Sequence, residues 1–199
     1  MEGTSGERLG VFGGTFDPIH IAHLVAAVNA RHVLRLDRVL LVVANRPWQK
    51  SDRTITSAED RYAMVEAAVT GHAGLEASRV EIDRGGDSYS ADTLRALADE
   101  DPARELFLVV GADVAAELET WRHVEVVRAL ATLAVVDRPG APDVDAGPGW
   151  RVVRVDIPHL AISASDLRHR AAAGLPLDYL VPAPVIDLIG ARGLYAGGR

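Results

Sequence analysis

The chain has no cysteine among its 199 residues, and it contains no long apolar or long basic run. The missing cysteine excludes disulfides, catalytic thiolates and zinc sites built on cysteine. No stretch approaches the roughly 18 apolar residues of a membrane span. The first ten residues, MEGTSGERLG, also lack the apolar core of a secretory signal. We therefore expect a soluble, cytoplasmic protein that has no membrane partner.

The sequence has no excess of basic charge either. Its 21 Lys and Arg residues stand against 28 Asp and Glu residues, which gives a formal net charge of −7 at pH 7. A surface that binds nucleic acid through its phosphates needs clustered basic residues. We therefore expect no nucleic-acid partner, although a local cationic site for a small anion is compatible with this composition.

Apolar residues are plentiful, at 48% of the sequence, and a chain of this length can bury a sizeable core with them. Short apolar runs alternate with helical periodicity. This alternation is typical of a Rossmann-like, doubly wound α/β fold with a mainly parallel sheet and helices on both faces. We expect a single domain over residues 1–199, with a C-terminal helical segment from about residue 163.

The apolar runs predict strands at residues 8–13, 38–43, 78–83, 105–110, 132–136 and 151–155. Helical spacing predicts helices near residue 21, after Ser57, and at residues 90–98, 114–118, 125–130, 165–173 and 184–191. Residues 139–149, PGAPDVDAGPG, are expected to form a surface loop.

The end of the first predicted strand carries the most informative stretch, residues 11–23, VFGGTFDPIHIAH. Gly13 and Gly14 break the strand, and an Asp-Pro turn leads into a helix. Singly, these are ordinary turn residues. Together they allow the backbone to approach a ligand, and a helix start favours negative charge through its unpaired N–H groups. The stretch therefore predicts an anion site, with phosphate as the first candidate.

His20 and His23 lie three residues apart in the first turn of that helix, so they share one face. Each alone is more typical of a surface or core histidine. A helix start favours an acid over a cation, so a pair of imidazoles there indicates that something anionic occupies this end.

Residues 13–23, GGTFDPIHIAH, resemble the GG(T/S)FDPxHxGH signature of the nucleotidyltransferase superfamily, whose H-x-G-H box binds the triphosphate of ATP or CTP. The one departure in eleven residues is Ala22, where the family has glycine. Its methyl group could crowd a phosphate, but a right-handed position at a helix start tolerates alanine. The resemblance implies catalytic roles for His20 and His23 and ATP contacts from Gly13, Gly14, Thr15 and Phe16.

A proline-containing loop, residues 47–50, follows the second predicted strand and ends in Lys50. Alone, this lysine reads as a solvated charge. In the family, a loop at this place ends in a basic residue that reaches phosphate, so the resemblance makes Lys50 the catalytic candidate and Arg46 a weaker one.

Residues 162–168, ISASDLR, resemble the I-S-S-T-x-x-R box of the same family. Their ordinary explanation is a capped helix start. Hydroxyls, free N–H groups and an arginine fork at a helix start also suit a second phosphate clamp. The resemblance implies that Arg168 is catalytic and that ATP contacts Ile162, Ser163 and Ser165, while Ala164 lacks one hydroxyl of the pattern.

Two further pieces resemble family elements on the ATP side. Gly111 and Asp113 follow the fourth predicted strand, where Asp113 is either a helix cap or a carboxylate for the ribose hydroxyls. Arg138 opens an Arg-Pro-Gly turn after the fifth predicted strand, which matches the family's R-P-G.

Residues 88–94, SYSADTL, together with Trp121 and Arg122, resemble the S-Y-T-x-D-T-L element and the tryptophan of the bacterial nicotinate mononucleotide adenylyltransferases, a family of NAD synthesis. Trp121 is otherwise a packing aromatic. The resemblance implies that the pyridine ring stacks on Trp121. Its carboxylate would meet helix-start N–H groups, the Ser90 hydroxyl and the Arg122 backbone N–H, with Tyr89 beside them.

The implied reaction joins ATP and nicotinate mononucleotide into nicotinate adenine dinucleotide and releases pyrophosphate, through positioning and charge stabilisation. Lys50 and Arg168 would hold the leaving group. Mg²⁺ would bind through the ATP phosphates, so no protein metal ligand is expected. The alternatives are nicotinamide mononucleotide or phosphopantetheine as acceptor, or a nucleotide-binding module without catalysis. The sequence leaves a homo-oligomer open.

Overall fold

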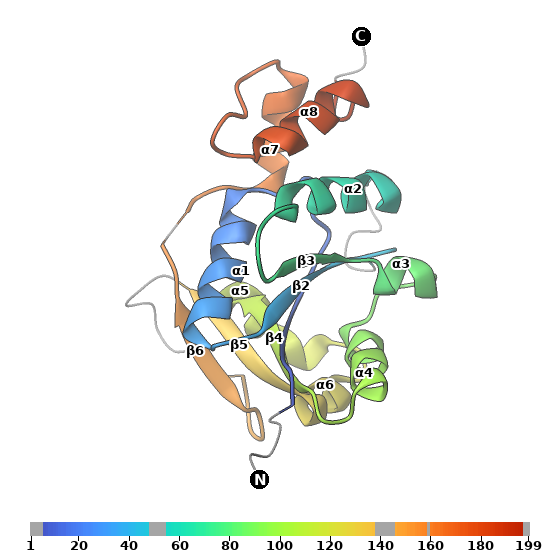
Figure 1. The fold of residues 1–199 in the computed structure, drawn as a ribbon, viewed down its shortest axis with the longest axis vertical. Coiled ribbons are helices and arrows are strands. Elements are labelled where there is room, and N and C mark those ends of the chain that lie inside the picture. Colours follow the sequence, from blue (N-terminus) through green and yellow to red (C-terminus); the bar gives the residue numbers. More distant parts are fainter. Residues whose placement is uncertain (1–5, 48–54, 138–145, 159, 197–199) are drawn as a thin grey trace.

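A computed structural model of the protein describes residues 6–47, 55–137, 146–158 and 160–196. The described residues form one sheet of six strands in the order β3-β2-β1-β4-β5-β6, and every neighbouring pair is parallel. Figure 1 shows this sheet with helices on both sides. The strands are β1 Arg8–Gly14, β2 Arg38–Val43, β3 Leu75–Ser78, β4 Glu105–Gly111, β5 Ala131–Asp137 and β6 Val152–Asp156.

This strand order confirms the doubly wound fold. The chain runs outward from β1 to β3, then returns to the other side of β1 and continues from β4 to β6. The order reverses between β1 and β4, so the loops after these two strands leave in opposite directions and open a crevice at their carboxyl ends. The register aligns Arg8 with Glu105 and Val11 with Leu108.

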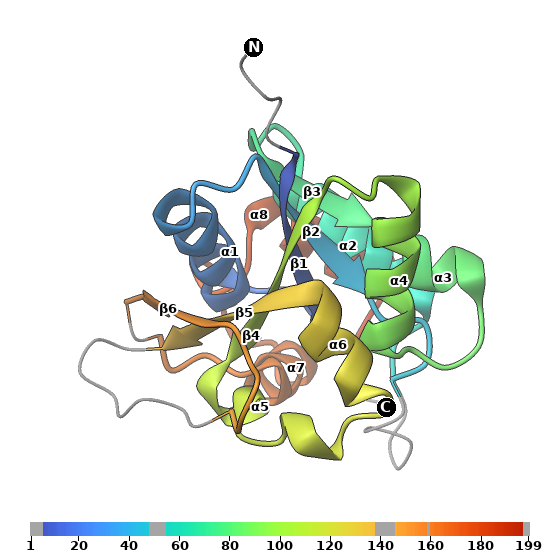
Figure 2. The same cartoon turned by 90° about the horizontal axis from the view of Figure 1, so that it is seen from below.

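Helices cover the sheet on two faces because successive strand residues point to opposite sides. Leu40 and Val42 pack with α4 (Ser90–Glu100) and α6 (Val124–Leu130), whereas Val39, Leu41 and Val43 pack with α1 (Ile21–Val33) and α2 (Ala58–Val69). Seen from below in Figure 2, α1 lies on one side of the sheet and α4 and α6 on the other. The helices are α1 Ile21–Val33, α2 Ala58–Val69, α3 Val80–Arg84, α4 Ser90–Glu100, α5 Ala112–Ala115, α6 Val124–Leu130, α7 Ala164–Ala172 and α8 Ala183–Ala191.

The predicted strand at residues 78–83 is wrong. The strand is β3, which ends at Ser78, and most of the predicted segment is the short helix α3. The alternating pattern has another cause, since α3 lies between two apolar cores. Val80 packs against the α4 and α6 core and Ile82 against the α2 core, while Glu81 is buried between them.

The other predicted elements agree with the structure within one or two residues, with one exception. The helix predicted at residues 114–118 is divided into α5 and a 3₁₀ turn at Leu118–Thr120. The loop predicted at residues 139–149 lies mostly outside the described residues. None of the helices in the described part of the chain combines the length and apolar character needed to cross a membrane.

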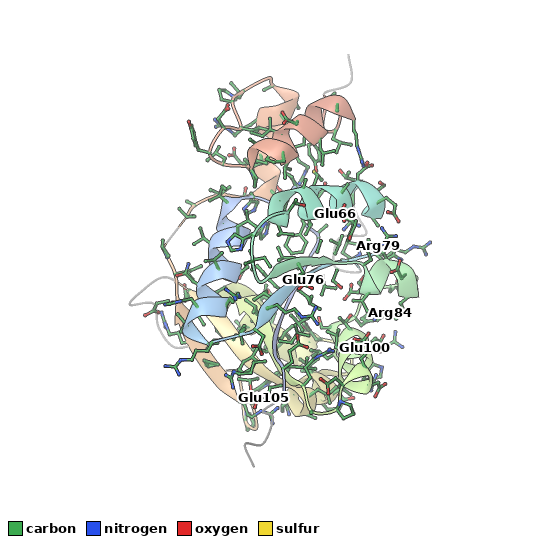
Figure 3. The ribbon with its side chains drawn as sticks, in the orientation of Figure 1. Glu66, Glu76, Arg79, Arg84, Glu100 and Glu105 are labelled. Carbon is green, nitrogen blue, oxygen red and sulfur yellow. The ribbon has the colours of Figure 1, made fainter. Side chains whose placement is uncertain are left out.

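Ion pairs concentrate at the amino end of the sheet. Glu7 accepts hydrogen bonds from Arg38 at 2.6 Å and from Arg104 at 2.8 Å, and Arg8 pairs with Glu105 at 2.6 Å. The Arg38 guanidinium lowers the pKa of the Glu7 carboxyl more than its burial raises it. Figure 3 shows Glu100 and Glu105 at the lower part of the molecule, away from α7 and α8. The crevice lies at the opposite end of the sheet, where the strands have their carboxyl ends.

Candidate active site

Two adjoining cavities occupy the crevice at the carboxyl ends of β1 and β4. The first, called the Trp121 cavity here, has a volume of about 240 Å³ and includes Ser90 and Trp121 in its wall. The second, the His23 cavity, has about 730 Å³ and includes Asp17 and His23. The two cavities share wall residues from the ends of β1 and β4: Phe12, Gly13, Gly14, Thr15, Gly111 and Val114.

The two glycines that end β1 have different structural requirements. A Cβ at Gly13 would meet no atom within 4 Å, and Gly13 lines both cavities. A Cβ at Gly14 would lie 2.7 Å from the ring of Phe16, which is 2% exposed. Gly14 is therefore required by packing, whereas Gly13 keeps space open where the cavities meet.

Two guanidinium groups hold the turn between β1 and α1. The buried Arg61 of α2 donates to the carbonyls of Thr15 at 2.9 Å and Asn45 at 3.1 Å, so it joins the segments that follow β1 and β2. Arg168 of α7 donates to the carbonyl of Asp17 at 2.7 Å. Phe16 between them has a φ of 50°, a left-handed conformation that is uncommon outside glycine. The turn is therefore fixed by side chains from two distant helices.

His20 and His23 form a stacked pair at the start of α1, with ring centroids 3.7 Å apart. The His20 backbone N–H donates to Nδ1 of His23 at 3.3 Å. A ring nitrogen that accepts a hydrogen bond carries no proton, so the His23 proton resides on Nε2. His23 lines the His23 cavity, whereas His20 lies behind it and is only 5% exposed.

Burial lowers the pKa of His20 to about 4. His20 is therefore neutral at pH 7. Its Nδ1 is buried and has no hydrogen-bond partner among the described residues. Leaving a buried ring nitrogen without a hydrogen-bond partner costs free energy. This indicates that a ligand or another group supplies the missing hydrogen bond at this end of α1.

The N–H groups at the start of α1 are less open than the sequence predicts. The Ile21 N–H donates to the carbonyl of Leu180 at 3.0 Å, so the C-terminal part of the chain occupies the first donor of this helix. Ala22, the departure from the family signature, lines the His23 cavity next to His23. An anion at this place therefore meets imidazole groups together with a reduced set of backbone donors.

The start of α7 faces the same cavity as the start of α1. Ile162 and Ala164 line the His23 cavity. Ser163 caps α7, with its Oγ accepting from the Asp166 N–H at 3.1 Å, and Arg168 donates to Oγ of Ser165 at 3.1 Å. The structure therefore brings both helix starts together, although the side chains of Ser163, Ser165 and Arg168 hold the local structure and do not line the cavity.

Gly111 and Asp113 lie at the end of β4 and the start of α5, and both line the His23 cavity. A Cβ at Gly111 would come within 2.6 Å of the Asp113 carboxylate, so glycine allows this carboxylate to fold back over the strand end. Asp113 is exposed to solvent. Asp113 does not cap α5, because the N-cap residue of this helix is Gly111 and no side chain caps it.

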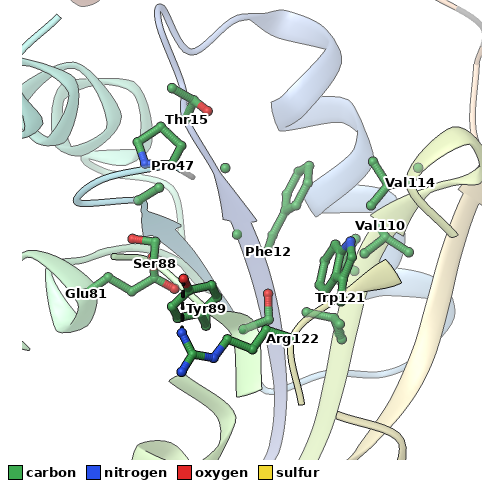
Figure 4. A pocket seen from close by; sticks show the side chains of 17 residues that line it. Phe12, Thr15, Pro47, Glu81, Ser88, Tyr89, Val110, Val114, Trp121 and Arg122 are labelled. Atoms are coloured by element: carbon green, nitrogen blue, oxygen red, sulfur yellow. Dashed lines mark hydrogen bonds between the residues drawn. The ribbon is translucent and has the colours of Figure 1, made fainter. Parts of the chain in front are cut away.

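The Trp121 cavity gathers the residues predicted for the second substrate. Ser90 begins α4, Tyr89 precedes it, and both line the cavity with Trp121 and Arg122. Arg122 donates to the Tyr89 hydroxyl at 3.4 Å, and its guanidinium carbon lies 4.9 Å from the centre of the Tyr89 ring. Figure 4 shows Tyr89 and Arg122 side by side, with Trp121 near Val110 and Val114.

Sequence reasoning missed two buried charged residues of this site. Arg61 lies on the buried face of α2, three and four residues before Met64 and Val65, and this spacing was a usable signal. Glu81 lines the Trp121 cavity at 6% exposure and accepts from the Thr93 hydroxyl at 2.6 Å. Glu81 was hidden because its segment was predicted to be a strand.

The remaining predicted candidates are Lys50, Arg138 and Arg46. Lys50 and Arg138 lie outside the described residues. Arg46 is exposed, and its carbonyl accepts from the Ser88 N–H at 3.1 Å, so its backbone supports the segment before α4. The described residues also contain no group of three or more His, Asp or Glu side chains that could hold a metal ion.

Comparisons with known proteins agree with this fold and crevice. The family model described as cytidylyltransferase-like matches residues 11–170, which places the protein in that class. Proteins named probable nicotinate-nucleotide adenylyltransferase from Corynebacterium kroppenstedtii and Streptomyces coelicolor are 46% and 47% identical. These matches cover 96% and 93% of this chain and 92% and 99% of the relatives. The chain therefore belongs to the nicotinate-nucleotide adenylyltransferases, a family of nucleotidyltransferases.

A solved structure has the same fold at low sequence identity. It is the nicotinic acid mononucleotide adenylyltransferase of Plasmodium falciparum complexed with NaAD, with a TM-score of 0.79 and 18% identity. The match covers 95% of this chain and 97% of that one.

The contrast between the two glycines is testable. We expect Gly13→Ala to keep the stability of the wild type but to weaken ATP binding about tenfold, because its methyl group enters the ligand space. Gly14→Ala should lower the free energy of unfolding by about 1–3 kcal/mol, because its methyl group overlaps Phe16. Urea unfolding and calorimetric titration with ATP measure both quantities. Wild-type ATP affinity in Gly13→Ala would contradict this assignment.

The lowered pKa of His20 gives a pH dependence with a defined sign. Unfolded His20 binds a proton below about pH 6.5, whereas the folded residue does so only near pH 4. Stability is therefore retained above pH 6.5 and falls as the pH is lowered towards 4, by about 3 kcal/mol at most from this residue. His20→Gln should remove that part of the pH dependence in urea unfolding. His169→Gln, which removes an exposed imidazole, is the control, and an equal effect of both variants would refute the prediction.

Proposed function

We propose that this protein transfers the adenylyl group of ATP to nicotinate mononucleotide and forms nicotinate adenine dinucleotide and pyrophosphate. The observation that carries this proposal is the pair of cavities that meet at Gly13 and Gly111. One cavity has imidazole and two helix starts in its wall, and the other has Trp121 and the start of α4. The names of the relatives and the NaAD complex of the structural neighbour support the same pair of substrates.

In this proposal ATP occupies the His23 cavity, with its phosphates near the starts of α1 and α7. Gly13, Gly14, Thr15 and Phe16 contact the nucleotide from the β1 side, Ile162, Ser163 and Ser165 from the α7 side, and Gly111, Asp113 and Arg138 from the remaining side. Asp113 accepts hydrogen bonds from the ribose. Lys50 and Arg168 stabilise the pyrophosphate that leaves.

Nicotinate mononucleotide occupies the Trp121 cavity with its pyridine ring on Trp121. Ser90, Arg122 and the N–H groups at the start of α4 hold its carboxylate, with Tyr89 packed against Arg122. A phosphate oxygen of the mononucleotide attacks the α-phosphorus of ATP, and the bond from this phosphorus to the bridging oxygen of pyrophosphate breaks. No side chain is modified, so catalysis consists of positioning and of stabilising negative charge.

His23 donates from Nε2 to a phosphate oxygen, and His20 supports the ring of His23 from behind. Mg²⁺ bound through the triphosphate would neutralise part of its charge. We assign no protein ligand to this ion. We also propose that residues 1–199 act as one domain, to which the segment from about residue 163 contributes the second phosphate contact.

Pyrophosphate release from ATP tests the proposed reaction. We expect turnover with nicotinate mononucleotide, and a kcat/KM at least about tenfold lower with nicotinamide mononucleotide. This ratio corresponds to one charge-assisted hydrogen bond, which the neutral amide does not replace. An enzyme-coupled assay for pyrophosphate measures both rates. Absence of turnover with either acceptor would overturn the proposed reaction.

Trp121→Ala tests the Trp121 cavity. Loss of stacking should raise KM for nicotinate mononucleotide about tenfold, because stacking of an aromatic ring contributes about 1–3 kcal/mol. KM for ATP should stay within twofold, since Trp121 does not line the His23 cavity. Trp150→Ala is the matched control, because Trp150 lines neither cavity and donates to Glu119 at 3.1 Å. A change confined to ATP would contradict the assignment of the pyridine site.

A further inference from the structure

The C-terminal part of the chain holds the start of α1 at three points. The Tyr195 hydroxyl donates to Oδ1 of Asp17 at 2.7 Å, Arg168 donates to the Asp17 carbonyl at 2.7 Å, and the Leu180 carbonyl accepts from the Ile21 N–H at 3.0 Å. Figure 1 shows α7 and α8 together at this end of the molecule, next to α2. Two of the three contacts converge on Asp17.

Asp17 is a buried carboxylate, 2% exposed, in the turn that leads from β1 to His20 and His23. It lines the His23 cavity but not the Trp121 cavity. The side chain of Arg61, 1% exposed, lies close enough to interact electrostatically with both Asp17 and Tyr195. A small change in the orientation of Asp17 therefore reaches the wall of the His23 cavity, whereas Asp17 has no part in the wall of the Trp121 cavity.

Tyr195 is held for this contact by its own surroundings. Its hydroxyl also interacts with Thr56 and lies 3.9 Å from Sδ of Met64, both near α2. Burial, and then the Asp17 carboxylate, raise the pKa of Tyr195, so the phenol keeps its proton. A phenol that keeps its proton can only donate to a carboxylate, which fixes the direction of this hydrogen bond.

We propose that Tyr195 is a positioning residue for the triphosphate site, which acts by holding Asp17 and thereby the turn that orients His20 and His23. This inference rests on the proposed function, in which ATP occupies the His23 cavity. Removing the hydroxyl leaves Oδ1 of a buried carboxylate without its donor, and such a group relaxes towards water or towards another donor. Either movement of the Asp17 carboxylate displaces the wall of the His23 cavity, which faces the phosphates.

A role limited to stability makes a different prediction. If the hydroxyl only held the C-terminal segment against the rest of the protein, its loss would lower the free energy of unfolding. The kinetic constants for both substrates would then stay unchanged below the melting temperature. A positioning role instead predicts an effect on ATP alone, because Asp17 lines only the His23 cavity.

Tyr195→Phe removes the hydroxyl and keeps the ring. We expect kcat/KM for ATP to fall about tenfold and KM for nicotinate mononucleotide to stay within twofold of the wild type. The matched control is Tyr179→Phe, since Tyr179 is 93% exposed, also has a positive φ, and lies in the same C-terminal segment. Tyr179→Phe should leave kcat/KM for ATP and KM for nicotinate mononucleotide unchanged. Initial rates with each substrate varied, measured below the melting temperature of each variant, give these values.

Calorimetric titration with ATP alone provides a second readout that does not require turnover. We expect the Kd for ATP to rise about tenfold in Tyr195→Phe. Wild-type affinity for ATP in this variant, or an equal loss for both substrates, would overturn the inference. If the wild type itself released no pyrophosphate, the proposed reaction would fail, whereas the ATP titration would still decide the role of Tyr195.

A second pair of variants applies if Tyr195→Phe does not fold. Asp17→Asn keeps an oxygen acceptor but removes the buried charge. Removing the Tyr195 hydroxyl from the Asp17→Asn variant should therefore lower the free energy of unfolding less than removing it from the wild type. The inference requires ATP to bind more weakly to Asp17→Asn/Tyr195→Phe than to Asp17→Asn. Equal affinity of these two variants would reject it.

Discussion

The turn between β1 and α1 depends on two guanidinium groups that donate to its carbonyls. Arg61 donates to Thr15 and Arg168 to Asp17, and these bonds span 46 and 151 residues of the chain. A turn with a left-handed phenylalanine is not stable by local preference, so it needs such external support. The glycine pair, the stacked histidines and the walls of both cavities all follow from the position of this turn.

The sheet topology places this turn beside the end of β4, where two cavities share one wall. Because β1 and β4 are neighbours and the chain leaves them in opposite directions, the residues at their ends form a common wall. A reaction between two phosphate groups needs this geometry, since the reacting atoms must approach while the remainder of each molecule stays separated. In the proposed reaction, the two substrates lie next to each other at this common wall.

Much of the fold was predictable from the sequence, because five of the six strands are apolar runs with clear boundaries. The sixth could not be predicted well. β3 has only four residues at the edge of the sheet, and α3 imitates a strand pattern by packing between two cores. The groups that line the cavities near Gly13, His23 and Trp121 were also predicted, since short motifs carry them.

The support of the site was not predictable in the same way. The spacing of Arg61 to Met64 and Val65 places it on the buried face of α2 but does not show which carbonyls it bonds, and Tyr195 meets Asp17 across 178 positions. No local pattern encodes such a distance. The predicted roles of Ser163, Ser165 and Arg168 were drawn from a helix-start motif, and the structure shows that their side chains already bond to the protein itself.

The bond between Ile21 and Leu180 has a consequence for biosynthesis. Ribosomes deliver the chain from its N-terminus, so β1 and α1 emerge long before the segment that includes Leu180 and Tyr195. A nascent chain that has completed the six strands still lacks an acceptor for the first amide of α1 and a donor for Asp17. The start of α1 therefore reaches its full set of hydrogen bonds only after the segment with Leu180 and Tyr195 has docked, so the crevice takes its described form late in synthesis.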